Sequence, residues 1–180
     1  VICNISIVGG IYLIMNMIAE RQFVGYSTYR SRLVDGHVHT ELCPHGSGDR
    51  TALMIEKAIE LRIEKICLTE HAPLPAGFEV EYGGDKVAYD TASLKMNQVD
   101  SYLELGRELQ RAYGTHIDIS LGFEIDYIPG FETDIQDFLD RYGPLTDDNI
   151  LSVHFMNGVA GQYYCVDYSA DEFAKGFAPW

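Results

Sequence analysis

Two patterns of apolar positions alternate along the chain from Arg32 onward. Short apolar runs are typical of buried strands, and longer stretches with apolar residues three or four positions apart are typical of amphipathic helices. The expected strands cover residues 33–39, 65–69, 117–125 and 149–155. The expected helices cover residues 51–61, 93–113 and 132–142, with Ser47 or Asp49 near the N-cap of the first and Gly114 as the C-cap of the second.

This regular alternation predicts an α/β fold with a parallel sheet, either a (β/α) barrel or a doubly wound sheet. Residues 163–166 form a possible fifth strand, the return arm of a hairpin through Asn157 and Gly158. Four parallel strands followed by a stop at Trp180 are typical of part of a barrel. We therefore expect a barrel that is truncated at its C-terminal end.

The first eighteen residues are nearly all apolar and approach the roughly 20 residues needed to cross a bilayer. No basic flank precedes them and no small-residue cleavage site follows them. We expect residues 1–31 to lie outside the domain, as a leader or as translated upstream sequence with Met15 or Met17 as the true initiator. A membrane anchor is the alternative. The domain is expected to cover residues 32–180.

The charge of the chain bears on its partners. Thirteen Lys and Arg against 27 Asp and Glu give a net charge of −14, which repels polyphosphate backbones, so we expect no nucleic-acid partner. Apart from the alternative of an anchor in the leader, we expect no membrane partner. A small phosphorylated substrate stays compatible, because bound divalent cations would invert the local field. The four cysteines are scattered without a CxxC pair, which is typical of reduced thiols in a cytoplasmic protein.

Histidines gather at the ends of the predicted strands. The carboxyl ends of parallel strands meet on one face, and residues i and i+2 of a strand point the same way. Imidazole and carboxylate suit zinc, manganese or iron, and a carboxylate can bridge two such ions. A lone strand-end histidine is more often structural, but the set favours a metal cluster, whereas His116 precedes its strand and is expected to be structural. The candidate ligands are His37, His39, His45, His71, Glu124 and His154.

Four neighbouring side chains are ambiguous. By alternation, Asp35 is expected to face the same way as His37 and His39. Glu70 either points away from the cluster or orients a ligand from outside it. Asp126 shares the side of Glu124 and is a candidate to handle a proton or hold a substrate amine, although a solvated loop position fits it as well. Cys43 is a weaker ligand candidate than His45.

Four motifs, in this order, resemble the polymerase-and-histidinol-phosphatase (PHP) superfamily, and within it the histidinol-phosphatases. They are DGHVHTELCPHGSGD, LTEHAPLPAGF, GFEIDYIPGFE and LSVHF, and the similarity covers residues 32–173. The resemblance implies a distorted, TIM-like (β/α)7 barrel with a three-metal cluster at the carboxyl ends of its strands. His37 and His39 would bind the first ion, Glu124 would bridge it to a second bound by His154, and His45 and His71 would hold the third.

The resemblance also implies an activity, the hydrolysis of L-histidinol phosphate to L-histidinol and phosphate in L-histidine biosynthesis. Two to three divalent ions (Zn, Mn or Fe) would activate the attacking hydroxide, with Glu124 and Asp126 as catalytic residues. The family's pattern continues with a further histidine, an Asp-x-His pair and phosphate-binding arginines beyond Trp180, so we expect the chain alone to be inactive or weakly active.

Two alternatives remain. One is a PHP-type phosphoesterase acting on nucleotides or DNA 3′ ends, which the net charge of −14 disfavours. The other is an inactive metal-binding fragment. A structural zinc site is usually closed and rich in cysteine, whereas histidine and carboxylate dominate here.

Overall fold

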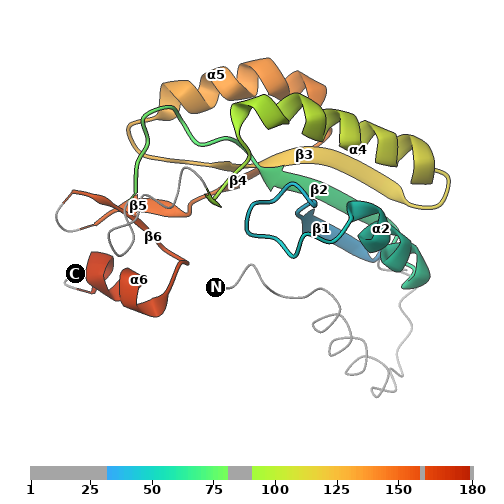
Figure 1. Cartoon of the computed structure of the whole chain (residues 1–180), viewed down its shortest axis with the longest axis horizontal. Coiled ribbons are helices and arrows are strands. Elements are labelled where there is room, and N and C mark those ends of the chain that lie inside the picture. The colour runs from blue at the N-terminus through green and yellow to red at the C-terminus, as the bar shows by residue number, and fades with distance from the viewer. Residues whose placement is uncertain (1–31, 81–90, 159–160, 179–180) are drawn as a thin grey trace, which may run out of the picture.

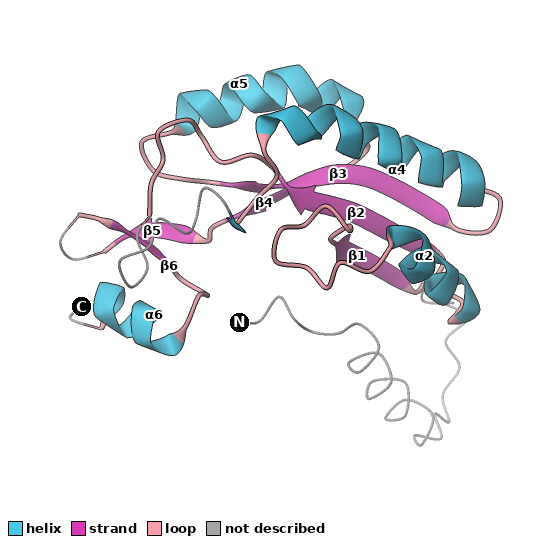
Figure 2. Ribbon diagram, in the orientation of Figure 1, coloured by secondary structure: helices cyan, strands magenta, loops and turns pink. Residues whose placement is uncertain are grey.

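Four parallel strands form one curved sheet, in the order in which they occur along the chain (Figures 1 and 2). The computed structural model describes residues 32–80, 91–158 and 161–178, so the leader expected over residues 1–31 lies outside the described residues. The sequential order adds each new strand to the same edge of the sheet, which is barrel-type winding and not double winding. The strands are β1 (Val34–Val38), β2 (Lys65–His71), β3 (Asp118–Asp126) and β4 (Ile150–Ser152).

Helices connect the strands, and α4 and α5 lie together over one face of the sheet (Figure 1). The expected hairpin is confirmed, because β5 pairs with β6 in antiparallel fashion beyond β4. A short 3-10 helix, Met96–Gln98, precedes α4, and a second one, Gly143–Leu145, follows α5. The remaining elements are α2 (Thr51–Glu60), α4 (Val99–Tyr113), α5 (Glu132–Tyr142), β5 (Phe155–Asn157), β6 (Tyr163–Cys165) and α6 (Ala170–Phe177).

The start of α2 differs from the prediction. Neither Ser47 nor Asp49 caps the helix, because these two side chains hydrogen-bond to each other at 2.9 Å. The Glu41 carboxylate instead accepts hydrogen bonds from the backbone N–H of Thr51, at 2.6 Å, and from its hydroxyl. A carboxylate here also interacts favourably with the positive end of the helix dipole.

The fourth strand covers only Ile150–Ser152 of the predicted 149–155, and ahead of its start side chains take over the pairing with β3. Asp147 Oδ2 accepts from the N–H of Leu121 at 3.0 Å, and Asn149 Oδ1 accepts from the N–H of Phe123 at 2.9 Å. Between them Gly122 lies so close to the 147–149 turn that a Cβ built there would be 1.4 Å from the carbonyl oxygen of Asp148. Only glycine permits this approach.

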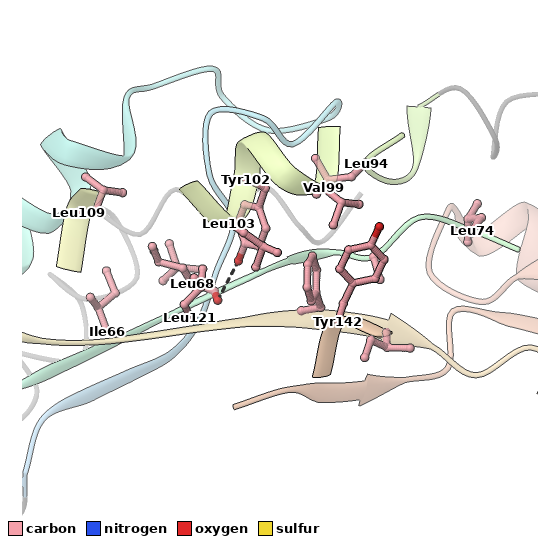
Figure 3. Packing of buried hydrophobic residues seen from close by; sticks show 14 of the residues in the cluster. Ile66, Leu68, Leu74, Leu94, Val99, Tyr102, Leu103, Leu109, Leu121 and Tyr142 are labelled. Carbon is pink, nitrogen blue, oxygen red and sulfur yellow. Dashed lines mark hydrogen bonds between the residues drawn. The ribbon is translucent and has the colours of Figure 1, made fainter. Parts of the chain in front are cut away.

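The helix-facing side of the sheet carries the core. Leu68 and Leu121 pack against α4, whose Tyr102 is fully buried (Figure 3). The Tyr102 hydroxyl lies 3.0 Å from the carbonyl oxygen of Leu68 and 2.5 Å from that of Gly122. It also accepts a hydrogen bond from the N–H of Glu70. One buried side chain thus joins β2 to β3.

The opposite side of the sheet carries polar residues. On β3 the side chains of Ser120, Glu124 and Asp126 alternate with those of the apolar core, and all three residues are buried. The β2–β3 register sets His71 beside Glu124 at the carboxyl end of both strands.

Among the described residues, no helix has both the length and the apolar character that crossing a bilayer requires.

Candidate metal centre

The Glu124 carboxylate lies at the centre of four imidazoles. Its Oε2 atom is 2.9 Å from His37 Nε2, 3.3 Å from His39 Nε2 and 3.2 Å from His71 Nδ1. Its Oε1 atom is 3.3 Å from His154 Nε2. The residue is 2% exposed, so this negative charge is held away from bulk water. The two oxygens therefore face different histidines.

These separations suit shared cations. An ion with bonds of about 2.0–2.2 Å to nitrogen and oxygen sets neighbouring ligand atoms about 3.0–3.4 Å apart. Among the described residues, two of the three groups with the spacing to hold an ion contain Glu124: His37 with His39 and Glu124, and His71 with Glu124 and His154. Glu124 belongs to both groups, which is the arrangement of a bridging carboxylate.

His71 gives an independent test of fit. Both of its ring nitrogens are buried, and neither makes a hydrogen bond among the described residues, although Nδ1 lies 3.2 Å from Glu124 Oε2. Unsatisfied buried polar atoms are rare because leaving one costs about 1–3 kcal/mol. A divalent ion bound at the ring would remove this cost, so the donor set fits a metal.

A β-bulge in β1 sets the direction of the His37 and His39 side chains. Asp35 pairs with Ile66, yet Val38 pairs with Leu68, so three steps along β1 match two along β2. After this bulge, His37 and His39 flank the buried Val38, and their Nε2 atoms approach to 3.1 Å. The expectation that alternation puts Asp35 on their side is wrong, because the extra residue breaks the period of two.

Glu70 orients His39 from outside the cluster. The side chain is fully buried, and its Oε1 lies 3.1 Å from His39 Nδ1. Its Oε2 accepts from the N–H and the hydroxyl of Thr40 at 2.8 and 2.7 Å. With Nδ1 donating to Glu70, Nε2 of His39 is the nitrogen left for a metal.

Asp126 holds His154 in the same way. Its Oδ1 is 2.7 Å from His154 Nδ1 and accepts from the His154 backbone N–H at 3.2 Å. Asp126 is 8% exposed, so it is not the solvated loop residue that the sequence also allowed. This contact fixes the ring with Nε2 towards Glu124.

The electrostatics of the side chains at this centre follow from these contacts. Burial would lower the pKa of His39, but hydrogen bonds to Glu124 and Glu70 outweigh it and raise the pKa to about 9. For His154, burial is likewise outweighed by Asp126, and the pKa rises to about 9. Burial, together with the charge of His39, lowers the pKa of His71 to about 3. Burial would raise the pKa of Glu124, but hydrogen bonds from His37 and His39 hold it well below its ordinary value.

The other candidates lie differently. The His45 ring is 5.1 Å from that of His71, but its Nε2 is 3.3 Å from the carbonyl oxygen of Ala92, and it joins neither Glu124 group. Cys43 Sγ has ligand spacing with His39 and Glu70, atoms that already hydrogen-bond to each other. His116 lies exposed before β3, at the far end of the sheet.

One contact to the cluster was not anticipated from the sequence. The Ser152 hydroxyl donates to Glu124 Oε1 at 2.6 Å. Its position two residues before His154 was an available signal, because alternation sets both side chains on the same face.

Comparisons with known proteins agree with this geometry. The PHP domain family model matches residues 35–177. The histidinol-phosphatase of Bacillus subtilis is 40% identical over 141 residues, which are 78% of this chain and 50% of the relative. The chain thus spans about half the length of that relative.

Two solved structures are also similar. One, from Listeria monocytogenes and assigned as a histidinol phosphatase, has 42% identity and a TM-score of 0.73, covering 78% of this chain and 52% of that one. The other is a histidinol phosphate phosphatase from Lactococcus lactis complexed with zinc, L-histidinol and phosphate, with 26% identity and a TM-score of 0.53, covering 69% of this chain and 41% of that one. The sequential parallel sheet, the strand-end histidines and the match over residues 35–177 agree, and the chain belongs to the PHP domain family.

Proposed function

We propose that this chain supplies the metal-binding part of an enzyme that hydrolyses L-histidinol phosphate to L-histidinol and phosphate in cytoplasmic L-histidine biosynthesis. The observation that carries the proposal is the position of Glu124, shared between two groups of histidines. Similarity to histidinol-phosphatases supports the choice of substrate. In this proposal residues 32–180 form the N-terminal part of one barrel domain, and residues 1–31 lie outside it.

The residues have distinct proposed roles at two to three divalent ions of zinc, manganese or iron. His37, His39 and Glu124 would hold one ion and Glu124 with His154 a second. His71 has the spacing to join this second group, or, with His45 nearby, would contribute to a third ion. Such ions supply a bound water with a pKa near 7 and positive charge opposite the phosphoryl oxygens.

Asp126 acts through His154 in this proposal, because its Oδ1 accepts hydrogen bonds from the ring and the backbone N–H of that residue. Residues 73–78 would border the histidinol end of the substrate. Phe78 in this loop is packed edge-on against Phe155 and Tyr163 of the β5–β6 hairpin, with ring centroids 5.0 Å apart in each case. That packing fixes the loop beyond the carboxyl ends of the strands.

Phosphate release from L-histidinol phosphate, measured beside AMP and a 3′-phosphorylated DNA strand, tests the substrate. Because the chain spans about half of the Bacillus subtilis relative, a hybrid is also required, in which residues 35–177 replace the matching half of that enzyme. We expect the hybrid to prefer L-histidinol phosphate and to lose activity by more than about 100-fold on Glu124→Gln, since a neutral amide bridges two cations poorly.

The control is Glu60→Gln in the hybrid, a change at an exposed position of α2. The proposal is refuted by a folded, metal-loaded hybrid that leaves L-histidinol phosphate intact, or that prefers AMP or DNA. Near-normal activity of Glu124→Gln with full metal content would remove the bridging role.

A further inference from the structure

We infer that Ser152 is a positioning residue that fixes the plane of the Glu124 carboxylate, so that Oε1 faces His154 while Oε2 faces His37, His39 and His71. The inference rests on the proposed function for its purpose, but its evidence is the geometry of the strand ends. The Ser152 hydroxyl donates to Glu124 Oε1 at 2.6 Å, a short, charge-assisted hydrogen bond.

Ser152 is itself held firmly by the sheet. Its Cα pairs with that of Asp126 in the parallel β3–β4 ladder. Its carbonyl oxygen accepts from the N–H of Tyr127 at 2.7 Å. The hydroxyl therefore approaches Glu124 from a strand whose register is fixed, and not from a loop.

Glu124 needs such a contact because the last torsion of a glutamate side chain is broad and roughly two-fold. Three of the imidazole contacts fall on Oε2, and one, from His154, falls on Oε1. The Ser152 hydroxyl donates to the same oxygen that faces His154, so it holds the carboxylate in the orientation that divides the four contacts in this way.

Loss of the hydroxyl should therefore weaken the His154 side of the centre more than the His37–His39 side. Outer hydrogen-bond partners of metal ligands are typically worth about 10–100-fold in metal affinity. We expect about a tenfold loss for the ion that needs Oε1 and little change for the ion that needs Oε2.

Ser152→Thr and Ser152→Val make the sharpest comparison, because the two side chains have nearly the same shape and differ in the hydroxyl. Titration of the metal-free 180-residue protein with Zn²⁺ gives affinity and stoichiometry, and Co²⁺ absorption reports the coordination geometry. Ser152→Thr should match the wild type, whereas Ser152→Val should lose about tenfold at one site and show an altered Co²⁺ spectrum.

Ser120→Ala is the matched control, because Ser120 is buried on the same face of β3 as Glu124 but is four residues away from it. If neither the Thr nor the Val variant folds, Ser152→Ala, which adds no volume, takes their place in the Zn²⁺ and Co²⁺ measurements. Equal Zn²⁺ affinities and Co²⁺ spectra for the Thr and Val variants, or for Ser152→Ala and Ser120→Ala, would overturn the inference. Failure to hydrolyse L-histidinol phosphate would instead count against the proposed function, since the metal titrations are independent of turnover.

Discussion

Asp126 Oδ1 lies 2.7 Å from His154 Nδ1, and the two residues have the same separation in sequence as the hydrogen-bonded pair Glu124 and Ser152. In both pairs a carboxylate of β3 holds a residue 28 positions further along the chain. The register of β3 against the β4 segment therefore assembles one side of the metal centre. A slip of one residue would separate both pairs.

Asp126→Asn should lower both the metal affinity of the centre and the pKa of His154. An asparagine oxygen can still accept the hydrogen bond, but the negative charge that raises the pKa to about 9 is lost. We expect about a tenfold loss of Zn²⁺ affinity and a His154 pKa closer to 6.5 in the metal-free protein. NMR titration of the imidazole protons measures the pKa, with Asp137→Asn on α5 as the control, and an unchanged value would contradict the assigned role of Asp126.

The metal-free protein should lose stability as the pH rises from 6.5 towards 9. His39 and His154 have folded-state pKa values of about 9, above the ordinary 6.5, so the folded state binds more protons in this window. Their stabilisation is complete below pH 6.5 and is lost as the pH rises through about 9. The lowered pKa of His71 acts only below pH 6.5, outside this window.

Urea denaturation with a chelator present, at pH 6.5, 7.5 and 8.5, measures this trend. His154→Asn should flatten it, whereas His116→Asn, at the other end of the sheet, should leave it as in the wild type. A free energy of unfolding that increases with pH in this range would show that the two imidazoles are not held protonated.

Tyr102→Phe should reduce the free energy of unfolding by about 1–3 kcal/mol, because it strands buried backbone groups of β2 and β3 that now bond to the hydroxyl. Tyr113→Phe is the matched control. Its hydroxyl donates to Glu56 at the surface, so we expect a change within about 0.5 kcal/mol. Equal effects of the two variants in urea denaturation would argue against a link between the strands through Tyr102.

Gly122→Ala should prevent folding or destabilise the protein by more than about 4 kcal/mol, because its Cβ would lie 1.4 Å from the carbonyl oxygen of Asp148. Gly143→Ala at the end of α5 meets nothing within 4 Å and should be tolerated. Soluble yield and thermal denaturation of the two variants give the comparison. A stable Gly122→Ala protein would mean that the 147–149 turn can move away from β3.

Local patterns were sufficient for much of this fold. The helix predicted over residues 132–142 has those bounds, since its apolar period and the following Gly143–Pro144 act within the segment itself. The i, i+2 spacing of His37 and His39 also implies their common direction. Clustering at the strand ends then follows from the parallel topology, so the approach of Glu124 to these histidines was predictable from the sequence.

Features that depend on a partner segment were not predictable. The bulge that separates Asp35 from His37 arises from the pairing of β1 with β2. Before the start of β4, Asp147 and Asn149 supply side-chain oxygens to β3, and beyond its end the His154 N–H bonds to the Asp126 side chain. The Glu70 side chain starts from the face of β2 that is directed towards the helices, yet it hydrogen-bonds to His39 beyond the end of β1. Each case is a tertiary contact between residues far apart in the sequence.

The two buried ring nitrogens of His71, which make no hydrogen bond among the described residues, have a consequence for the stability of the protein in a cell. An empty centre carries an uncompensated cost that an occupied one does not, so a ligand that binds only the folded chain raises the folded fraction. We expect scarcity of the ion to shorten the survival of the polypeptide under proteolysis, so that its abundance follows the supply of transition metal without any change in transcription.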